Sequence, residues 1–207
     1  MTALSGAALS QKTVNDPNAE KRDVNNFHGI DVATGIKLIL SEGNTEEVAV
    51  SASKTEYRDK IITKVENGVL KIHYETKMGA INKKNETKGL RAYVSYKTLD
   101  KLDVSSGAEV EINGLLASVS LDLKANTGGG IKGARNITTL KVYQSTGSKI
   151  TLSGKAENLE VRGDTGSKFL GEGLNITNCT AVAGTGAGVY ITVQKEFAKR
   201  VAASPGS

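Results

Sequence analysis

The stretch LKVYQSTGSKITLSGKAEN, residues 140–158, is followed at once by LEVRGDTGSKFLGEGLNITN, residues 159–178. Each begins with an apolar residue, places a second one two positions later, and reaches Thr-Gly-Ser after a short alternating run. Similar segments recur along the second half of the chain at spacings of 19, 19, 19 and 20 residues. Their first residues are Leu102, Leu121, Leu140, Leu159 and Cys179. Such self-similarity is the signature of a repeat architecture.

The repeats predict short strands, because apolar and polar residues alternate with a period of two. Apolar residues also recur two and ten positions after each first residue: Val104, Leu123, Val142, Val161 and Ala181, then Ile112, Ile131, Ile150, Phe169 and Val189. Each run is too short to bury itself, but copies stacked about 4.8 Å apart would pair every backbone amide and align these side chains. We therefore predict an all-β fold, a β-solenoid with coils of about 19–20 residues. Leucine-rich repeats fit less well, because the pattern lacks their helical or extended return arm. Calcium-binding nonapeptide repeats also fit less well, because the turns lack a regularly recurring Asp.

A turn is expected seven residues after the start of each of the last four repeats. Glycine stands there each time and Thr precedes it: Thr127-Gly128, Thr146-Gly147, Thr165-Gly166 and Thr185-Gly186. Glycine would supply the left-handed residue of the turn. In the first repeat, LDVSSG, the corresponding turn is expected to be two residues shorter.

The tripeptide Arg162-Gly163-Asp164 matches the motif by which many surface proteins engage integrins. Asp164 lies five residues after its repeat begins, where the other repeats have Asn126, Ser145 and Gly184. Tight turns select these residue types, since Asn, Asp and Ser accept a hydrogen bond from the backbone two residues on. The turn therefore explains Asp164 without a receptor.

Residues 24–100 are rich in strands but less regular, and we divide the chain into a leader remnant and linker (1–23), this β-rich part (24–100) and the regular repeats (101–207). The inward candidates in its first segments are Ile30, Val32, Ile36, Leu38 and Leu40. Asn67-Gly68 between two alternating runs predicts a hairpin. The region could form distorted coils or a small sheet that caps the stack. The Lys-rich segment 77–88 is interpreted as a solvated loop, with polyanion binding as the alternative.

Composition excludes several classes of function. The net charge of +5 arises from 27 basic and 22 acidic residues that alternate in sign, and aromatic residues make up 4% of the chain, which argues against a nucleic-acid partner. No apolar run is long enough for a transmembrane helix. The start, MTALSGAALSQKT, resembles the end of a trimmed secretory leader, with a possible cleavage before Gln11, and favours export.

No catalytic, metal or cofactor site is predicted. His28 and His73 lack partners at metal-ligand spacing, and Cys179 is expected to be a small core residue. β-Solenoids often host polysaccharide lyases or hydrolases, which need clustered carboxylates. Stacking would place Asp103, Asp122, Lys141 and Glu160 in one outward column, where Lys141 interrupts the acidic run. A lyase or hydrolase acting on acidic glycans is the alternative interpretation.

Three stretches carry a family resemblance: QKTVNDPNAEKRDVNNFHGIDVATGIKLILSEGNTEEVAVSAS (11–53), GVLKIHY (68–74) and LRAYVSYKTLDKLDVSSGAEVEING (90–114). With the Thr-Gly-Ser turns, their order resembles the family called putative auto-transporter adhesin, head GIN domain, of Gram-negative envelope proteins. The resemblance implies a right-handed, single-stranded β-helix in an exported or surface-exposed protein, and it brings no catalytic residues. The Thr-Gly turns differ from the Ser-Gly-Ala turns frequent in that family, and a closing Gly-rich coil is expected to be missing after Ser204.

The sequence thus predicts a non-enzymatic β-helix module, an adhesin or envelope scaffold that binds an extracellular glycan or a surface protein. The expected location is periplasmic, outer-membrane-associated or extracellular in a Gram-negative bacterium. The candidate contact residues lie at or next to the turns: Asn126, Ser145, Asp164, Lys149 and Lys168.

Overall fold

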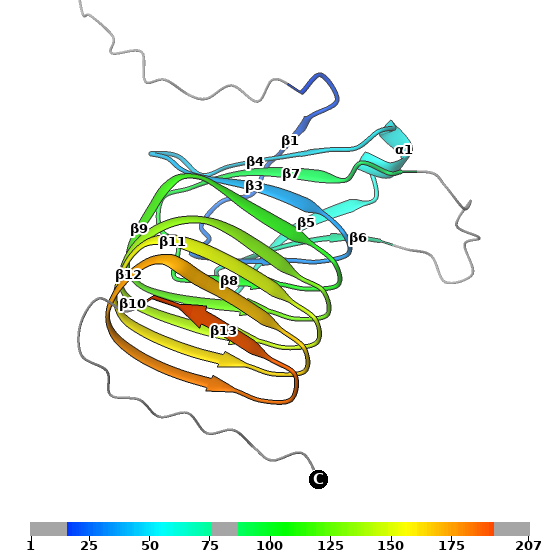
Figure 1. Cartoon of the computed structure of the whole chain (residues 1–207). Coiled ribbons are helices and arrows are strands. Elements are labelled where there is room, and N and C mark those ends of the chain that lie inside the picture. Colours follow the sequence, from blue (N-terminus) through cyan, green and yellow to red (C-terminus); the bar gives the residue numbers. More distant parts are fainter. Residues whose placement is uncertain (1–15, 76–86, 193–207) are drawn as a thin grey trace, which may run out of the picture.

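The computed structural model describes residues 16–75 and 87–192. Strands make up 64% of it and helix 2%, and its stacked coils form a β-solenoid of about five turns, which confirms the predicted fold (Figure 1). The possible leader, most of the Lys-rich segment and the residues after Thr192 lie outside the described residues. The elements are β1 (Glu20–Arg22), β2 (Gly29–Val32), β3 (Lys37–Glu42), β4 (Glu47–Ser51), α1 (Thr55–Arg58), β5 (Ile61–Glu66), β6 (Val69–Tyr74), β7 (Arg91–Tyr96), β8 (Lys101–Val104), β9 (Glu109–Ala125), β10 (Gly130–Gln144), β11 (Lys149–Gly163), β12 (Lys168–Ala183) and β13 (Gly188–Ile191).

The regular coils stack in parallel in the order β9, β10, β11, β12 and β13. Leu121 pairs with Leu140, Leu140 with Leu159, and Leu159 with Cys179. This register confirms the predicted column, and the three leucines in it are almost fully buried. Burying such side chains stabilises the fold by about 1.5–3 kcal/mol each.

The first repeat is displaced by two residues from its predicted register. Leu102 pairs with Leu123 rather than with Leu121. Val110, not Ile112, pairs with Ile131. The turn sets this alignment, because Gly107 N–H donates to Thr127 O at 3.0 Å and so stacks one turn on the next.

The turn of the first repeat is therefore not shorter than the others. Ala108 N–H donates to Ser105 O at 3.0 Å, so the turn has the same four residues as its successors. Two additional residues are absorbed later, where β9 runs from Glu111 to Leu115 opposite the shorter run of β10 from Lys132 to Ala134. Gly114, with φ of 82°, lies within this bulge.

The first half of the chain is both coil and cap. β2 pairs in parallel with β6 and β8, and β3 pairs in parallel with β7 and β9, so these strands continue the stack. β1, β4 and β5 pair antiparallel with their neighbours at the same end of the molecule. The hairpin at Asn67-Gly68 is confirmed, since β5 and β6 flank it and both turn residues have positive φ.

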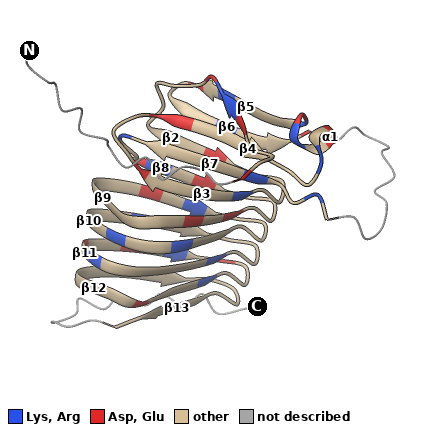
Figure 2. Ribbon diagram, turned by 90° about the horizontal axis from the view of Figure 1, so that it is seen from above, with Lys and Arg blue, Asp and Glu red and all other residues tan. Residues whose placement is uncertain are grey.

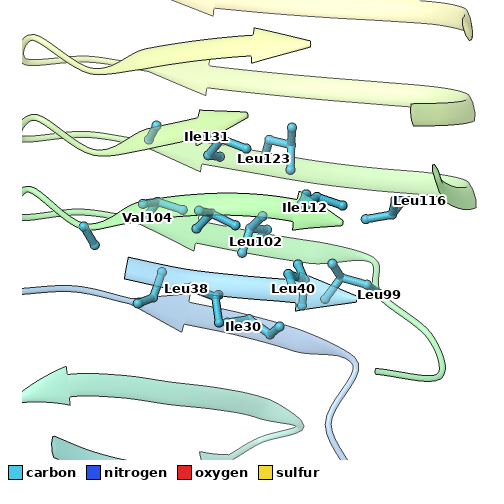
Figure 3. Close-up of a cluster of buried hydrophobic side chains, with 14 of the residues drawn as sticks. Ile30, Leu38, Leu40, Leu99, Leu102, Val104, Ile112, Leu116, Leu123 and Ile131 are labelled. Atoms are coloured by element: carbon cyan, nitrogen blue, oxygen red, sulfur yellow. The ribbon is translucent and has the colours of Figure 1, made fainter. Parts of the chain in front are cut away.

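The core is one continuous column of mostly aliphatic side chains between the faces of the coils (Figure 3). The five inward residues predicted for the first half are confirmed, each with an exposed fraction of 0%: Ile30, Val32, Ile36, Leu38 and Leu40. Leu38 and Leu40 of β3 pair with Val110 and Ile112 of β9, so the first half and the regular repeats share this core.

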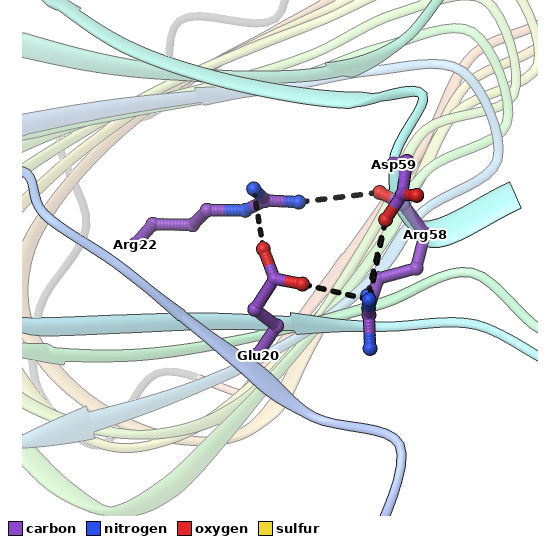
Figure 4. A network of polar contacts seen from close by, with 4 residues as sticks. All are labelled: Glu20, Arg22, Arg58 and Asp59. Atoms are coloured by element: carbon purple, nitrogen blue, oxygen red, sulfur yellow. Dashed lines mark hydrogen bonds and ion pairs between the residues drawn. The ribbon is translucent and has the colours of Figure 1, made fainter. Parts of the chain in front are cut away.

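A network of ion pairs joins the ends of the capping elements (Figure 4). The Glu20 carboxylate of β1 lies 2.8 Å from the Arg22 guanidinium and 2.7 Å from the Arg58 guanidinium of α1. Arg22 also donates to the Arg58 carbonyl at 3.3 Å. Charged side chains on a short edge strand oppose pairing with other chains, so this end of the stack is protected.

The turns contain two left-handed residues, not one. In the turn Ser145–Ser148, Ser148 N–H donates to Ser145 O at 3.2 Å, and both Thr146 (φ 48°) and Gly147 (φ 69°) are left-handed. The same holds at Thr127 and Thr165. A β-branched residue is strained in this conformation, whereas Asn adopts it readily.

Replacing Thr146 with Asn should therefore stabilise the protein by about 0.5–1 kcal/mol, because the left-handed strain is relieved. The measurement is the free energy of unfolding from urea titration. Thr151 is the matched control: it lies exposed within β11, where Thr suits an extended backbone, and Thr151→Asn should give no gain. Equal effects of the two substitutions would contradict the assignment of strain to the turn.

Candidate binding surface

The predicted turn residues Asn126, Ser145 and Asp164 lie one above another at the same corner of successive coils. Ser145 N–H donates to Ala125 O at 3.0 Å, and Asp164 N–H donates to Gln144 O at 2.9 Å. Each of the three residues accepts the hydrogen bond that closes its own turn. The turns therefore form a straight polar edge along the solenoid.

Asp164 holds two successive turns together. Its Oδ1 accepts from Thr165 N–H at 2.7 Å and from Thr185 N–H of the next coil at 3.1 Å. The predicted bond from the backbone two residues on is thus wrong, because the left-handed Thr165 turns its own N–H toward the carboxylate. Gly184 provides the space: a Cβ there would lie 2.7 Å from Oδ1.

The Arg-Gly-Asp tripeptide follows the geometry of this corner. Gly163 is buried, and Arg162 lies on the outer face with its Nε 3.4 Å from a carboxylate oxygen of Glu160. In the neighbouring coil the first two positions are Tyr143 and Gln144. The structure therefore gives Asp164 a role in the turn, as its position in the repeat predicted.

Lys149 and Lys168 lie directly beside one another on the face that follows the turns. They are in-register partners of β11 and β12, and both are exposed. Glycine occupies the position on each side of them, Gly130 in β10 and Gly188 in β13. Neither lysine forms an ion pair within residues 16–75 and 87–192. We call this pair the lysine column.

Like charges placed directly opposite each other on neighbouring strands destabilise a sheet. Other lysines face a carboxylate on the neighbouring strand, as for Lys37, which lies 3.2 Å from Glu111 and lowers the pKa of that carboxyl group. The lysine column is distinctive because two cations lie directly opposite each other and glycine, not a carboxylate, occupies the position on either side.

The outward column predicted to contain Asp103, Asp122, Lys141 and Glu160 is wrong at its first member, because the first repeat is displaced by two residues. Asp122, Lys141 and Glu160 do stack, but Lys101 occupies the place expected for Asp103. The column thus alternates in sign along the stack. Figure 2 shows that basic and acidic residues are both spread over the coils. Among the described residues no three His, Cys, Asp or Glu side chains gather in a group that could hold a metal ion.

Asp103 instead lies in a neighbouring column, opposite Lys124 and Asp31. Burial and, to a lesser degree, the nearby Asp103 charge raise the pKa of Asp31. Lys101 lies 3.3 Å from Asp103 and partly offsets the negative charge. This pair of carboxylates is balanced by adjacent lysines.

The two histidines and the cysteine take structural positions. His28 Nδ1 lies 2.8 Å from Asp100 Oδ1, and His73 pairs with Ile62 across the hairpin. Cys179 is half-buried against the core, and burial raises the pKa of its thiol. No helix in the described part of the chain is long and apolar enough to cross a membrane.

Two large polar side chains lie inside the solenoid, where periodicity did not predict them, and three small ones, Ser51, Ser148 and Ser167, are buried as well. Arg135 and Gln144 both have an exposed fraction of 0%. The sequence does contain a signal for the burial of Arg135, because the equivalent positions of the other coils hold apolar residues or glycine. Arg135 pairs with Leu116 and Gly154, and Gly154 pairs with Leu174. An arginine in such a column departs from the pattern of the core.

The comparisons with known proteins agree with the predicted family. A family model described as putative auto-transporter adhesin, head GIN domain, matches residues 26–205. The fold resembles the crystal structure of a putative adhesin from Bacteroides fragilis (TM-score 0.71, 15% identity, covering 90% of this chain and 88% of that one). It also resembles a putative lipid binding protein from Parabacteroides distasonis (TM-score 0.66, 12% identity, covering 92% of this chain and 96% of that one). A third similar structure is a putative adhesin from Parabacteroides merdae (TM-score 0.61, 13% identity, covering 89% of this chain and 94% of that one). Among curated proteins none matches the chain.

Substituting Asp164 tests the link between turns. Asp164→Ala should lower the free energy of unfolding by about 1 kcal/mol and speed amide exchange at Thr185, because that N–H loses its acceptor. Asp164→Asn retains an oxygen acceptor and should lose less. Asn126→Ala is the control, since among the described residues the Asn126 side chain accepts only from the Thr127 hydroxyl. The role fails if Thr185 exchanges at the same rate in the wild type and in Asp164→Ala.

Proposed function

Because the chain belongs to the family of putative auto-transporter adhesins with a head GIN domain, we propose that it is a non-enzymatic surface module that binds an acidic glycan through the lysine column. Family membership supports an adhesin-like protein at the cell surface or exported from the cell. The observation that carries the choice of ligand is the in-register stacking of Lys149 on Lys168 without an ion-pair partner. The polar turn edge at Asn126, Ser145 and Asp164 adjoins this column.

An anionic ligand would offset the repulsion between the two ammonium groups. Lys132 lies one coil earlier, but it is in register with Glu111 of β9 and does not extend the column. Carboxylates or sulfates along a sugar chain would meet the two ammonium groups in turn. Charged contacts of this kind favour encounter and selectivity more than great affinity.

The solenoid arranges weak contacts in a row. Neighbouring coils lie about 4.8 Å apart, so an extended chain lying along the axis passes one lysine or turn per coil. Several such contacts act together once the first is made, which raises the overall affinity. Rigid strands rather than loops hold the lysines, so little ordering is needed on binding.

The face around the column suits a polar chain with some apolar surface. Leu170 pairs with Tyr190 in the outward column next to the lysines, and about half of the Tyr190 surface is exposed. The ring of Tyr190 lies over Gly188, where a Cβ would be 2.7 Å from it. An exposed aromatic ring beside cations can pack against the apolar side of a sugar ring.

The test is binding of the purified chain to an array of neutral and acidic glycans, followed by affinity measurement on the best ligand. The double substitution Lys149→Gln/Lys168→Gln should weaken binding about tenfold or more and reduce its dependence on salt. The matched control is Lys124→Gln/Lys141→Gln, which removes the same charge from exposed lysines on β9 and β10 and should change affinity little.

Equal losses in the two double variants would show that only the net charge matters and would remove the lysine column from the proposal. Binding to neutral glycans alone would contradict the ligand class. Release of shortened or unsaturated products from an acidic glycan would show catalysis and contradict a non-enzymatic module. We place the protein in the periplasm, at the outer membrane or outside a Gram-negative cell, and fractionation of the native host would test this.

A further inference from the structure

Arg135 carries a positive charge into the core of the solenoid. Its side chain has an exposed fraction of 0%, although the core around it is aliphatic. Burial lowers the pKa of Arg135 to about 10, which still leaves the guanidinium protonated at neutral pH. An uncompensated charge in such a place is strongly unfavourable, so a compensating group is expected.

The Arg135 guanidinium has hydrogen-bond donors that no described residue satisfies. Nη1 donates to the carbonyl of Ala134 at 3.0 Å, whereas Nε and Nη2 are buried without an acceptor in the described part of the chain. Within residues 16–75 and 87–192, Arg135 forms no ion pair. Two N–H groups that share one positive charge are therefore available to a single acceptor.

A second unpartnered donor comes from a distant part of the chain. Tyr96, the last residue of β7, has an exposed fraction of 1%, and its hydroxyl has no hydrogen-bond partner among the residues that the structure describes. Burial raises the pKa of this phenol, so it is a neutral O–H donor at neutral pH. Arg135 and Tyr96 are close enough for the charge of each to affect the pKa of the other.

The backbone makes room for the head group. A Cβ at Gly133 would lie 2.8 Å from Arg135 Nη1 and equally close to Cβ of Ile112. Ile112 pairs with Leu40 of β3, and Leu40 pairs with Val94 of β7, two residues before Tyr96. The arginine head thus reaches from β10 toward the strands that end at Tyr96.

We propose that Arg135 and Tyr96 form an internal site for one small monovalent anion, for which chloride is the probe. The anion would accept from the guanidinium and the phenol and neutralise the buried charge. Water could satisfy the donors but not the charge. This site is independent of the lysine column, and its role is to stabilise the coils between the cap and the regular repeats.

The experiment compares thermal unfolding in sodium chloride and in sodium gluconate at equal ionic strength. The wild type should melt at a higher temperature in chloride, by about 3–6 °C at ten times the dissociation constant, and the shift should grow with the logarithm of concentration above that constant. Arg135→Met should abolish the chloride shift and should melt higher than the wild type in gluconate, because a buried charge is replaced by an apolar chain.

Arg162→Met is the matched control. It removes the same charge from an exposed arginine of β11 and should keep the chloride shift. A shift that persists in Arg135→Met, or that disappears in Arg162→Met, overturns the proposal, because chloride would then act on the surface. If Arg135→Met does not fold, Tyr96→Phe serves instead, since it keeps the charge but removes one donor and should weaken chloride binding severalfold.

Glu42 is the competing source of negative charge, because it is the in-register partner of Tyr96 at the end of β3. If Glu42 neutralised Arg135, the wild type would show no chloride shift and Glu42→Gln would lower the melting temperature. That result would overturn the anion site. Bromide in crystals of the wild type should give an anomalous peak between Arg135 and Tyr96, and a peak elsewhere only would likewise contradict it.

Discussion

The backbone hydrogen bonds between successive turns determine the register of the whole solenoid. At the corners of the regular coils a left-handed glycine donates its N–H to the threonine carbonyl of the next turn, as for Gly128 to Thr146 at 2.9 Å and Gly147 to Thr165 at 3.0 Å. The side-chain period of a strand is two, so a slip of one residue at the corner would turn each inward side chain outward. The aliphatic core and the charged outer columns both depend on this alignment.

The sequence was sufficient for the parts of the fold in which every coil repeats the same local solution. The column from Leu121 to Cys179, the inward residues of β2 and β3 and the hairpin at Asn67-Gly68 all follow from periodicity and turn chemistry. The displacement of Leu102 could not be predicted by matching apolar residues, because Leu121 and Leu123 are both leucines and either could be the partner of Leu102. Only the stacking of Gly107 on Thr127 decides between them, and it depends on a bulge at Gly114.

The candidate site was predictable to a different degree. Periodicity placed Lys149 beside Lys168 and stacked the three turn residues, since in-register coils require it. It did not predict the bonds of Asp164, because they depend on the left-handed conformation of Thr165 and on the absence of a side chain at Gly184. It also misplaced Asp103, since a displacement of two residues moves a carboxylate from one outward column to the next while it remains on the same face.

Departures from the repeat are more informative than the repeat itself. Gln144 stands in an inward column whose neighbours are Ala125 and Gly163, and the small neighbours leave space for its amide to donate to Lys168 O at 3.1 Å. Arg135 likewise pairs with a glycine, Gly154. A side chain at Gly154 would collide with the Arg135 carbonyl, so its absence leaves the space that this pairing needs. In both places a large polar residue and a glycine occur together on adjacent coils. Because stacked coils place equivalent positions in contact, a polar residue can enter the core only where the next coil gives up volume, and such pairs mark where a solenoid holds polar groups inside.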